Sequence, residues 1–327
     1  MADNYNLLDY ARQFGPDSKE YSVAKVLAQS NPILQDAVMI EGNSDSGHEY
    51  AIQTGLPTAT WRKAYQGVQP SKSTRTVVKE TFGICSEVSA IDKVIAEKGG
   101  NIAKVRASEA EAHLESMSQA IATKIIYGSE AVTEESFVGL AARYNKISTD
   151  KTKSGYNIIS AGSSTSGSMC SIWIIGWGEG KIFTFAPKGS KSGIETIDYS
   201  ANGPIAIEDS KGGTYPGYKE QFECKIGLGV QDWRYAVRIP NILLGTTTAD
   251  NLRKLVLNGL DRIHNLSLCK PVIYCNRECK SLLREAQDAK SNVWYDPKDP
   301  NARPVFAIND VPVKTLDCLV NTEATVS

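Results

Sequence analysis

The chain has 327 residues, of which 41% are hydrophobic and 22% are charged. These fractions are ordinary for soluble globular proteins, and they exclude disordered, collagen-like and membrane-embedded classes. One hydrophobic core rarely serves a chain of this length, so about two domains are expected. Lysine and arginine total 36 against 37 acidic residues, giving a net charge of -1. This balance creates no overall attraction to nucleic acid or a membrane, so any DNA contact must be local.

Three features indicate synthesis in the cytoplasm. The longest apolar runs, such as 172–177, are far shorter than the roughly 20 residues that cross a bilayer. The N-terminal residues MADNYNLLDYARQ lack the pattern of a signal peptide. The seven cysteines include no CxxC pair, which is typical of reduced intracellular thiols. Cys275 and Cys279 have no histidine nearby, so we interpret them as buried small hydrophobes rather than zinc ligands.

Residues 1–45 mix short helical stretches with helix breakers. Helices are predicted over 4–13 and 22–30, and Gly15-Pro16 and Asn31-Pro32 interrupt them. The segment is therefore interpreted as an arm rather than a domain.

Residues 60–93, TWRKAYQGVQPSKSTRTVVKETFGICSEVSAIDK, predict two long polar strands joined by a Gly and Pro loop at 67–71. Neither strand has a continuous apolar face, and an isolated two-stranded ribbon is marginal in water. Trp61, Tyr65 and the basic residues are therefore expected to pack on another surface, which we take to be a second copy of this chain.

The longest predicted helix spans 102–127, with a later start capped by Ser108 and Glu111 as an alternative. At 1.5 Å per residue it would extend for roughly 35 to 40 Å. Arg106, Glu109, Glu111 and Glu115 are predicted to lie largely on its solvent-facing side. Apolar residues recur along it at steps of three and four: Val105, Ala110, Leu114, Met117, Ile121 and Ile125.

After residue 150 the predicted order is strands, helix, strand, helix, strands. The runs SIWIIGWG and KIFTFAP are typical of buried strands, and further strands are predicted over 220–226 and 232–239. Thr248 is expected to begin one helix and Asn276 to cap another. This order lacks regular βαβα alternation, so the predicted fold class is α+β.

No catalytic constellation emerges. The segment 176–181 lacks the spacing of a phosphate-binding loop, and a turn between strands is the preferred interpretation. The Gly and Ser run at 162–171 lacks a nucleophile elbow, and the three histidines lie in unrelated contexts. We expect no enzyme activity, no cofactor and no metal. A hydrolase that uses Cys170 or a neighbouring serine is the alternative from another class.

Taken in chain order, the hairpin, the long helix and the mixed domain resemble the major capsid proteins of tailed bacteriophages, which have the Hong Kong 97 type fold. The resemblance runs from about Thr60 to the end of the chain. It implies a structural subunit that assembles as hexamers and pentamers into an icosahedral shell around double-stranded DNA. The stretches most similar to a podophage-type group of like length are TWRKAYQGVQPSKST, FVGLAARYN, SIWIIGWG, PKGSKSG, DWRYAVRIPNI and LVNTEA.

The resemblance implies a division of the chain. Residues 1–45 would be an N-terminal arm, 46–93 an extended β-hairpin loop, and 94–154 a peripheral domain with a spine helix at 102–127. Residues 155–327 would form the axial domain together with returning strands of the peripheral domain.

The extended loop is the expected contact with a neighbouring subunit, and charge pairing would set its register. The acidic side of the spine helix is one candidate for the surface it meets. Lys188 and Lys191 are expected either to contact phosphate or a neighbour's carboxylates, or to lie in a solvated loop. The residues expected at the loop contact are Trp61, Arg62, Lys63, Tyr65, Lys72, Arg75 and Lys79.

The resemblance implies that the chain is assembled in the host cytoplasm and is located in the virion. It also implies further partners there. They are a portal protein, a decoration protein and packaged double-stranded DNA, bound non-specifically at the inner face. An arm of about 45 residues is too short for a built-in scaffold, so a separate scaffolding protein is expected. No motif identifies a Lys–Asn cross-link involving Lys63 or Lys72, so covalent joining is not expected. The alternative within virions is another structural protein, from the tail or near the portal.

Overall fold

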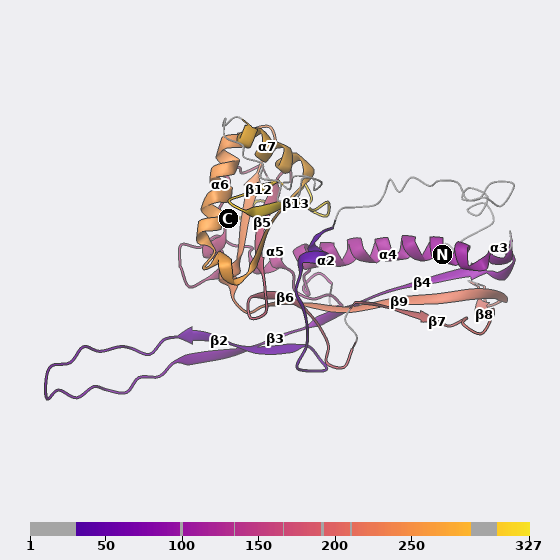
Figure 1. Cartoon of the computed structure of the whole chain (residues 1–327), viewed down its shortest axis with the longest axis horizontal. Helices are drawn as coiled ribbons and strands as arrows, with labels where there is room; N and C mark the ends of the chain where they lie inside the picture. The colour runs from indigo at the N-terminus through magenta and orange to yellow at the C-terminus, as the bar shows by residue number, and fades with distance from the viewer. Residues whose placement is uncertain are drawn as a thin grey trace, which may run out of the picture.

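The molecule is elongated, with a narrow hairpin at one end, a long helix beside a long sheet at the other, and a compact unit above their junction (Figure 1). The structure is a computed structural model. The helices predicted over 4–13 and 22–30 lie outside the residues that it describes, and so does Lys191. The described residues are 31–98, 101–133, 135–165, 167–190, 193–209, 211–288 and 306–327.

The hairpin is formed by β2 (His48–Gly55) and β3 (Thr74–Glu80), which pair antiparallel with His48 opposite Glu80. Residues 56–73 form the loop between them and contain no strand. The prediction of a strand beginning at Thr60 is therefore wrong. This segment contains Pro57 and Pro70, which lack the N–H that a strand ladder needs.

The long sheet begins where the chain leaves the hairpin at Thr81. β4 (Phe82–Asp92) pairs antiparallel with β9 (Thr214–Val230) along its whole length. The sequence prediction counted 82–93 with the hairpin, whereas residues 82–92 belong to the long sheet and Lys93 begins α3. Two short strands, β7 (Ile194–Asp198) and β8 (Ile205–Glu208), pair with the other edge of β9.

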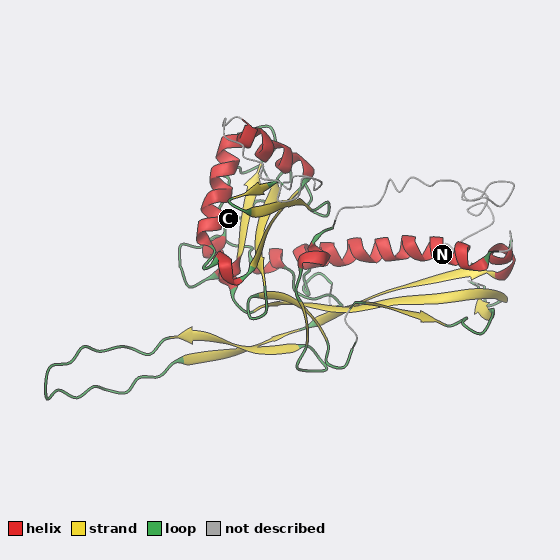
Figure 2. Cartoon of the chain, viewed as in Figure 1, coloured by secondary structure: helices red, strands yellow, loops and turns green. Residues whose placement is uncertain are grey.

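The long helix α4 (Ile102–Tyr127) lies along one face of this sheet (Figure 2), and its bounds confirm the prediction. Asn101 caps it by accepting a hydrogen bond from the backbone N–H of Lys104. Most of its fully buried residues lie in the C-terminal half, where the compact unit also covers the helix. They are Val105, Met117, Ile121, Ala122, Ile125 and Ile126.

The compact unit is built around β5 (Cys170–Trp177), all of whose residues are buried, as predicted. β5 pairs antiparallel with β10 (Ala236–Ile242) on one side and with β11 (Lys270–Cys275) on the other. The sheet continues through β13 (Val311–Thr315) to β12 (Ala307–Ile308).

Two helices pack on this sheet, α6 (Ala249–Arg262) and α7 (Arg277–Asp288). Gly259 allows α6 to approach β5 closely, because a Cβ atom at that position would lie 2.7 Å from Cδ1 of Ile174. The predicted caps are confirmed: Thr248 accepts from the N–H of Asn251, and Asn276 accepts from the N–H of Cys279.

β6 (Ile182–Ala186) joins the two parts of the sheet. It pairs antiparallel with β9 and parallel with β1 (Met39–Glu41), and a bridge from Ile182 to Trp177 connects it to β5. The turn expected at 176–181 is confirmed, with Gly180 at a φ of 73°. The short helices are α2 (Ile33–Asp36), α3 (Lys93–Glu97), α5 (Leu140–Arg143), η1 (Ser154–Asn157), η2 (Trp233–Tyr235) and η3 (Leu266–Leu268).

Elements after residue 150 follow the predicted order of strands, helix, strand, helix, strands, and the α+β class is confirmed. The strand predicted over 232–239 begins later, at Ala236, because Asp232 caps the 3-10 turn η2. Among the described residues, none of the helices combines the length and apolarity needed to cross a bilayer.

Candidate functional site

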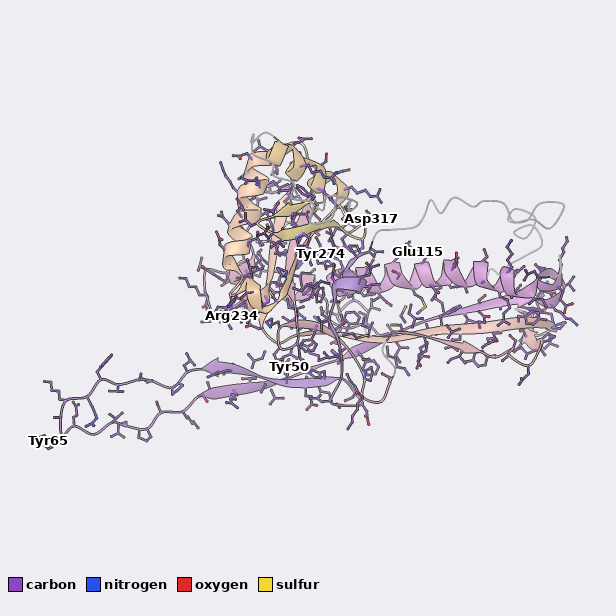
Figure 3. All side chains as sticks on the ribbon, viewed as in Figure 1. Tyr50, Tyr65, Glu115, Arg234, Tyr274 and Asp317 are labelled. Atoms are coloured by element: carbon purple, nitrogen blue, oxygen red, sulfur yellow. The ribbon has the colours of Figure 1, made fainter. Side chains whose placement is uncertain are left out.

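The hairpin presents its largest side chains to solvent, and Figure 3 places Tyr65 at its far end. Trp61 is 99% exposed and Tyr65 is 105% exposed. The loop is held by its own polar contacts, since the Oγ of Ser71 donates to the carbonyl of Thr58 at 3.1 Å and accepts from its N–H at 3.1 Å. Two aromatic side chains on a narrow projection are therefore available for contact with another molecule.

The basic residues predicted at this contact fall into two groups. Arg62, Lys63 and Lys72 lie in the exposed loop with the two aromatic residues. Arg75 and Lys79 lie on β3, and Lys79 already has a partner, because its Nζ is 3.6 Å from the Glu49 carboxylate on β2. The far end of the loop therefore presents Trp61 and Tyr65 with the neighbouring Arg62 and Lys63, whereas Lys72 lies close to the start of β3 and Lys79 lies nearer the hairpin root.

Lys188 is separate from that group. It is exposed near the hairpin root and lines an open hollow of about 570 Å³ with Lys225, Asp45 and Glu195. Both signs of charge surround this hollow, so it is not a dedicated anion site.

The hairpin root is fixed by a buried carboxylate that sequence reasoning missed. Glu80, the last residue of β3, accepts two hydrogen bonds from the Arg143 guanidinium, at 2.7 and 2.6 Å. It also accepts one from the Tyr50 hydroxyl at 2.6 Å. Burial and the Glu80 charge raise the pKa of Tyr50, so its hydroxyl remains a neutral donor. Only the folded chain brings Arg143 of α5 to Glu80, so no local motif signalled this contact.

His48 begins β2 and packs among aromatic rings at the same root. Its ring centroid lies 5.4 Å from that of Phe183, 5.6 Å from that of Phe185 and 5.9 Å from that of Tyr50. Its Nδ1 is buried without a hydrogen-bond partner. Burial lowers the pKa of His48 and outweighs the opposing charge of Glu80. The neutral imidazole is therefore the form that fits the folded hairpin root.

We expect the free energy of unfolding to fall when the pH drops below the ordinary histidine pKa of about 6.5. In the unfolded chain His48 binds a proton there, whereas the lowered pKa delays protonation in the folded chain. Urea midpoints measured at pH 7.5 and 5.5 should differ less for His48→Phe than for the original chain. His264→Gln, at an exposed histidine, is the control. Equal acid sensitivity of the original chain and His48→Phe would contradict this assignment.

One charged side chain of the spine helix that was predicted to face solvent instead faces the sheet. Arg106 was expected on the solvent-facing side, but its guanidinium donates to Asp198 of β7 and to Glu220 of β9, each at 2.6 Å. The prediction for Arg106 is therefore wrong. The two carboxylates on adjacent strands draw this long side chain across the sheet surface, which periodicity alone cannot show. Glu111 is exposed, while Glu109 and Glu115 are partly buried.

A second buried carboxylate connects the spine helix to the compact unit. Glu323 accepts from Arg238 of β10 at 2.8 Å, from the Tyr127 hydroxyl at the end of α4 at 2.5 Å, and from Ser171 of β5. The side chains of Arg238 and Glu323 are only 6% and 5% exposed. The C-terminal segment thus supplies a side chain that joins three separate elements.

A third carboxylate holds the segment around α2 against the compact unit. Asp36 accepts from Lys314 at 2.6 Å, from Lys270 at 2.9 Å and from the Tyr274 hydroxyl at 2.9 Å (Figure 3 shows Tyr274 within the compact unit). Burial opposes the charged form, but these hydrogen bonds outweigh it and hold the pKa of Asp36 below its usual value. The last part of the predicted arm, around α2, is therefore anchored on β11 and β13.

The chemistry considered for a hydrolase is not assembled in the part of the chain that the structure describes. Cys170 is fully buried, and its polar contacts are the carbonyl of Ile242 and the thiol of Cys279. The three histidines lie against other rings: His48 by Phe183, His113 by Phe222 and His264 by Tyr235. No group of three metal-ligating side chains occurs among the described residues.

Comparisons with known proteins agree with this geometry. A chain in the cryo-EM structure of bacteriophage Epsilon15 is 26% identical with a TM-score of 0.76, and the match covers 99% of this chain and 98% of that one. The bacteriophage JBD30 capsid matches at 11% identity and a TM-score of 0.50, covering 91% and 93%, which is a likeness of fold alone.

No curated protein sequence matches this chain. The model of one family, described as major capsid protein GP7, matches residues 15–327. That match includes the hairpin, the spine helix and the compact unit. The chain therefore belongs to the major capsid protein GP7 family and has the Hong Kong 97 type fold of phage capsid proteins, as its sequence resemblance predicted.

Proposed function

We propose that this chain is the subunit of an icosahedral phage shell, assembled as hexamers and pentamers around double-stranded DNA, with a structural rather than enzymatic role. Membership of the capsid family supports the shell. The observation that carries the assembly mechanism is the hairpin, whose root is buried against the body while its tip exposes Trp61 and Tyr65 almost completely. A fixed root and an exposed tip suit a strap that lies on a neighbouring subunit.

Within this proposal the aromatic residues supply most of the affinity of the contact. Burying one large aromatic side chain removes about 150–250 Å² from water, a gross gain of about 4–6 kcal/mol before the costs of association. An exposed ion pair contributes only about 0.2–1 kcal/mol. The basic residues therefore set register and association rate. The contact residues that we propose are Trp61, Arg62, Lys63, Tyr65, Lys72, Arg75 and Lys79.

The direct test is electron microscopy of the full chain expressed alone and with the phage's candidate scaffolding protein. Closed shells or free hexamers are expected. A chain that stays monomeric in every assembly condition would contradict the proposal. Densitometry of purified virions distinguishes the alternative of a tail or portal-proximal protein, since a shell subunit should be the most abundant virion protein.

Reversing charge at Lys72 and Arg75 tests the role given to the basic residues. We expect Lys72→Glu with Arg75→Glu to slow assembly about tenfold at low salt, with a smaller effect at high salt, because exposed charges act mainly on association rate. Light scattering during assembly measures this rate. The matched control is Lys151→Glu with Lys153→Glu, at exposed positions outside the hairpin. Equal slowing in the control pair would show a general charge effect and would refute the local one.

Other partners are proposed for the assembled particle. They are a separate scaffolding protein, a portal protein, a decoration protein, and packaged DNA contacted non-specifically at the inner face. The even balance of 36 basic and 37 acidic residues supports close packing of many copies without strong mutual repulsion. Lys188 and Lys191 are proposed as additional loop contacts. The family supports a location in the virion capsid, and we propose assembly in the host cytoplasm.

A further inference from the structure

Two cysteine thiols touch inside the compact unit. The Sγ atoms of Cys170 and Cys279 are 3.3 Å apart, although the residues are 109 positions apart in sequence. Both residues are 0% exposed. Cys170 begins β5 and Cys279 lies in the first turn of α7, so each sulfur is carried by a regular element rather than by a loop.

The surrounding contacts hold both sulfurs in place. The N–H of Cys279 donates to the side chain of Asn276 at 2.8 Å, which fixes the start of α7. Cys170 is paired with Ile242 in the β5–β10 ladder, and its thiol donates to the Ile242 carbonyl at 3.6 Å. A disulfide bond is about 2 Å long, so an approach of about 1 Å would join the two sulfurs.

The remaining cysteines are arranged differently. All seven lie within the described residues and are free thiols. Cys275 is buried beside this pair, but its own thiol donates to the carbonyl of Lys314 at 3.9 Å. Cys85 and Cys224 are opposite each other in the β4–β9 register, yet Cys170 and Cys279 are the pair of described cysteines whose sulfurs are in contact.

We propose that Cys170 and Cys279 form a latent disulfide site, which is reduced as the chain folds and is closed by a peroxide. The site lies within one chain, so this inference does not depend on the proposed shell. Because the sulfurs are buried and already adjacent, a small oxidant needs only a local opening to reach them. In a reducing cytoplasm such a pair stays as thiols.

The chemistry balances with one molecule of hydrogen peroxide. The reaction can begin at either sulfur. Written for Cys170, its sulfur loses a proton and attacks the peroxide, so an S–O bond forms and the O–O bond breaks. The departing hydroxide takes up the proton that Cys170 released. Cys279 then attacks the Cys170 sulfenic acid: the S–S bond forms, the S–O bond breaks, and the second hydroxide takes the proton from Cys279. Two thiols and one peroxide thus give one disulfide and two waters.

The bond would join the first residue of β5 to α7 and close a loop of 109 residues. Closing a long loop restricts the unfolded chain, so the oxidised form should unfold at a higher denaturant concentration. The compact unit would then be cross-linked internally when the chain meets peroxide.

The test uses the full chain, treated with hydrogen peroxide after removal of reductant, then unfolded and alkylated. Free thiols are expected to fall by two from the seven of the reduced chain, and peptide mapping without reductant should recover one peptide pair linked through Cys170 and Cys279. Cys170→Ala and Cys279→Ala should each keep all remaining thiols, whereas Cys318→Ala, another buried cysteine, should still lose two.

Several results would contradict the proposed disulfide site. Linkage of Cys279 to Cys275 would do so, and so would an unchanged count of seven thiols while methionine sulfoxide accumulates. The peptide map of the original chain decides the question even if an alanine variant fails to fold. The urea midpoint of the oxidised chain should rise and return to its starting value with dithiothreitol. A lower midpoint in the oxidised chain would refute the role as an internal staple.

Discussion

Replacing both Trp61 and Tyr65 by alanine is expected to abolish assembly of hexamers and shells while the isolated chain keeps its fold. Both side chains are almost fully exposed, so their removal costs the folded monomer little. At a contact, an aromatic anchor of this kind is worth at least about 2 kcal/mol, or about thirtyfold in affinity. Each shell contact would lose two anchors, and the loss would repeat at every subunit.

Light scattering and electron microscopy measure the assembly of this variant, and near-ultraviolet circular dichroism measures its fold. Val132→Ala is a suitable control, because Val132 is 85% exposed and lies outside the hairpin. The control should assemble normally. Normal shells from the double variant would show that the hairpin tip is not the strap, while the family membership would stand. Unfolding of the double variant would contradict the exposure of these two side chains.

Replacing Glu323 by alanine is the change with the largest expected effect on stability. It leaves the buried Arg238 guanidinium without its carboxylate, and it removes the acceptor used by Tyr127 and Ser171. Breaking a buried ion pair in this way costs about 3–5 kcal/mol in free energy of unfolding. Urea denaturation of the isolated chain measures this loss.

Two further variants test whether this loss of stability is specific to the buried ion pair. Asp317→Ala breaks another Arg–carboxylate pair, but its partner Arg277 is 73% exposed, so the loss should stay below about 1 kcal/mol. Glu323→Leu combined with Arg238→Met removes both charges and should recover most of the stability. If Glu323→Ala and Asp317→Ala cost the same, Glu323 is not the buried link between the spine helix and the compact unit.

The three buried carboxylates suggest how the elongated chain keeps its shape. Glu80 fixes the hairpin, Glu323 fixes the end of the spine helix, and Asp36 fixes the last part of the predicted arm. Each is paired with Arg or Lys from a distant part of the sequence. Because a buried charge without its partner is costly, these contacts penalise alternative placements of the projecting parts.

The candidate site was predicted in part. Composition and turn signals located an unpartnered projection and its aromatic and basic residues, since polar strands without an apolar face cannot bury themselves. The position of the first strand was predicted wrongly. β2 begins at His48 rather than near Thr60, because polar residues carry no period-two apolar pattern by which a register could be recognised.

The elements with strong local signals could be predicted from the amino-acid residues alone. The spine helix has its predicted bounds because apolar periodicity continues to Tyr127 and Asn101 caps its start. Strand β5 could be predicted as buried because its residues form an apolar run without a solvent-facing side. Three contacts became visible only in the folded chain: those of Arg106 with the sheet, of Glu80 with Arg143, and between the two touching thiols. Those contacts join residues that are dozens to more than a hundred positions apart in the sequence. They are favoured because folding buries the polar groups, which then need partners, and a local sequence pattern does not show this.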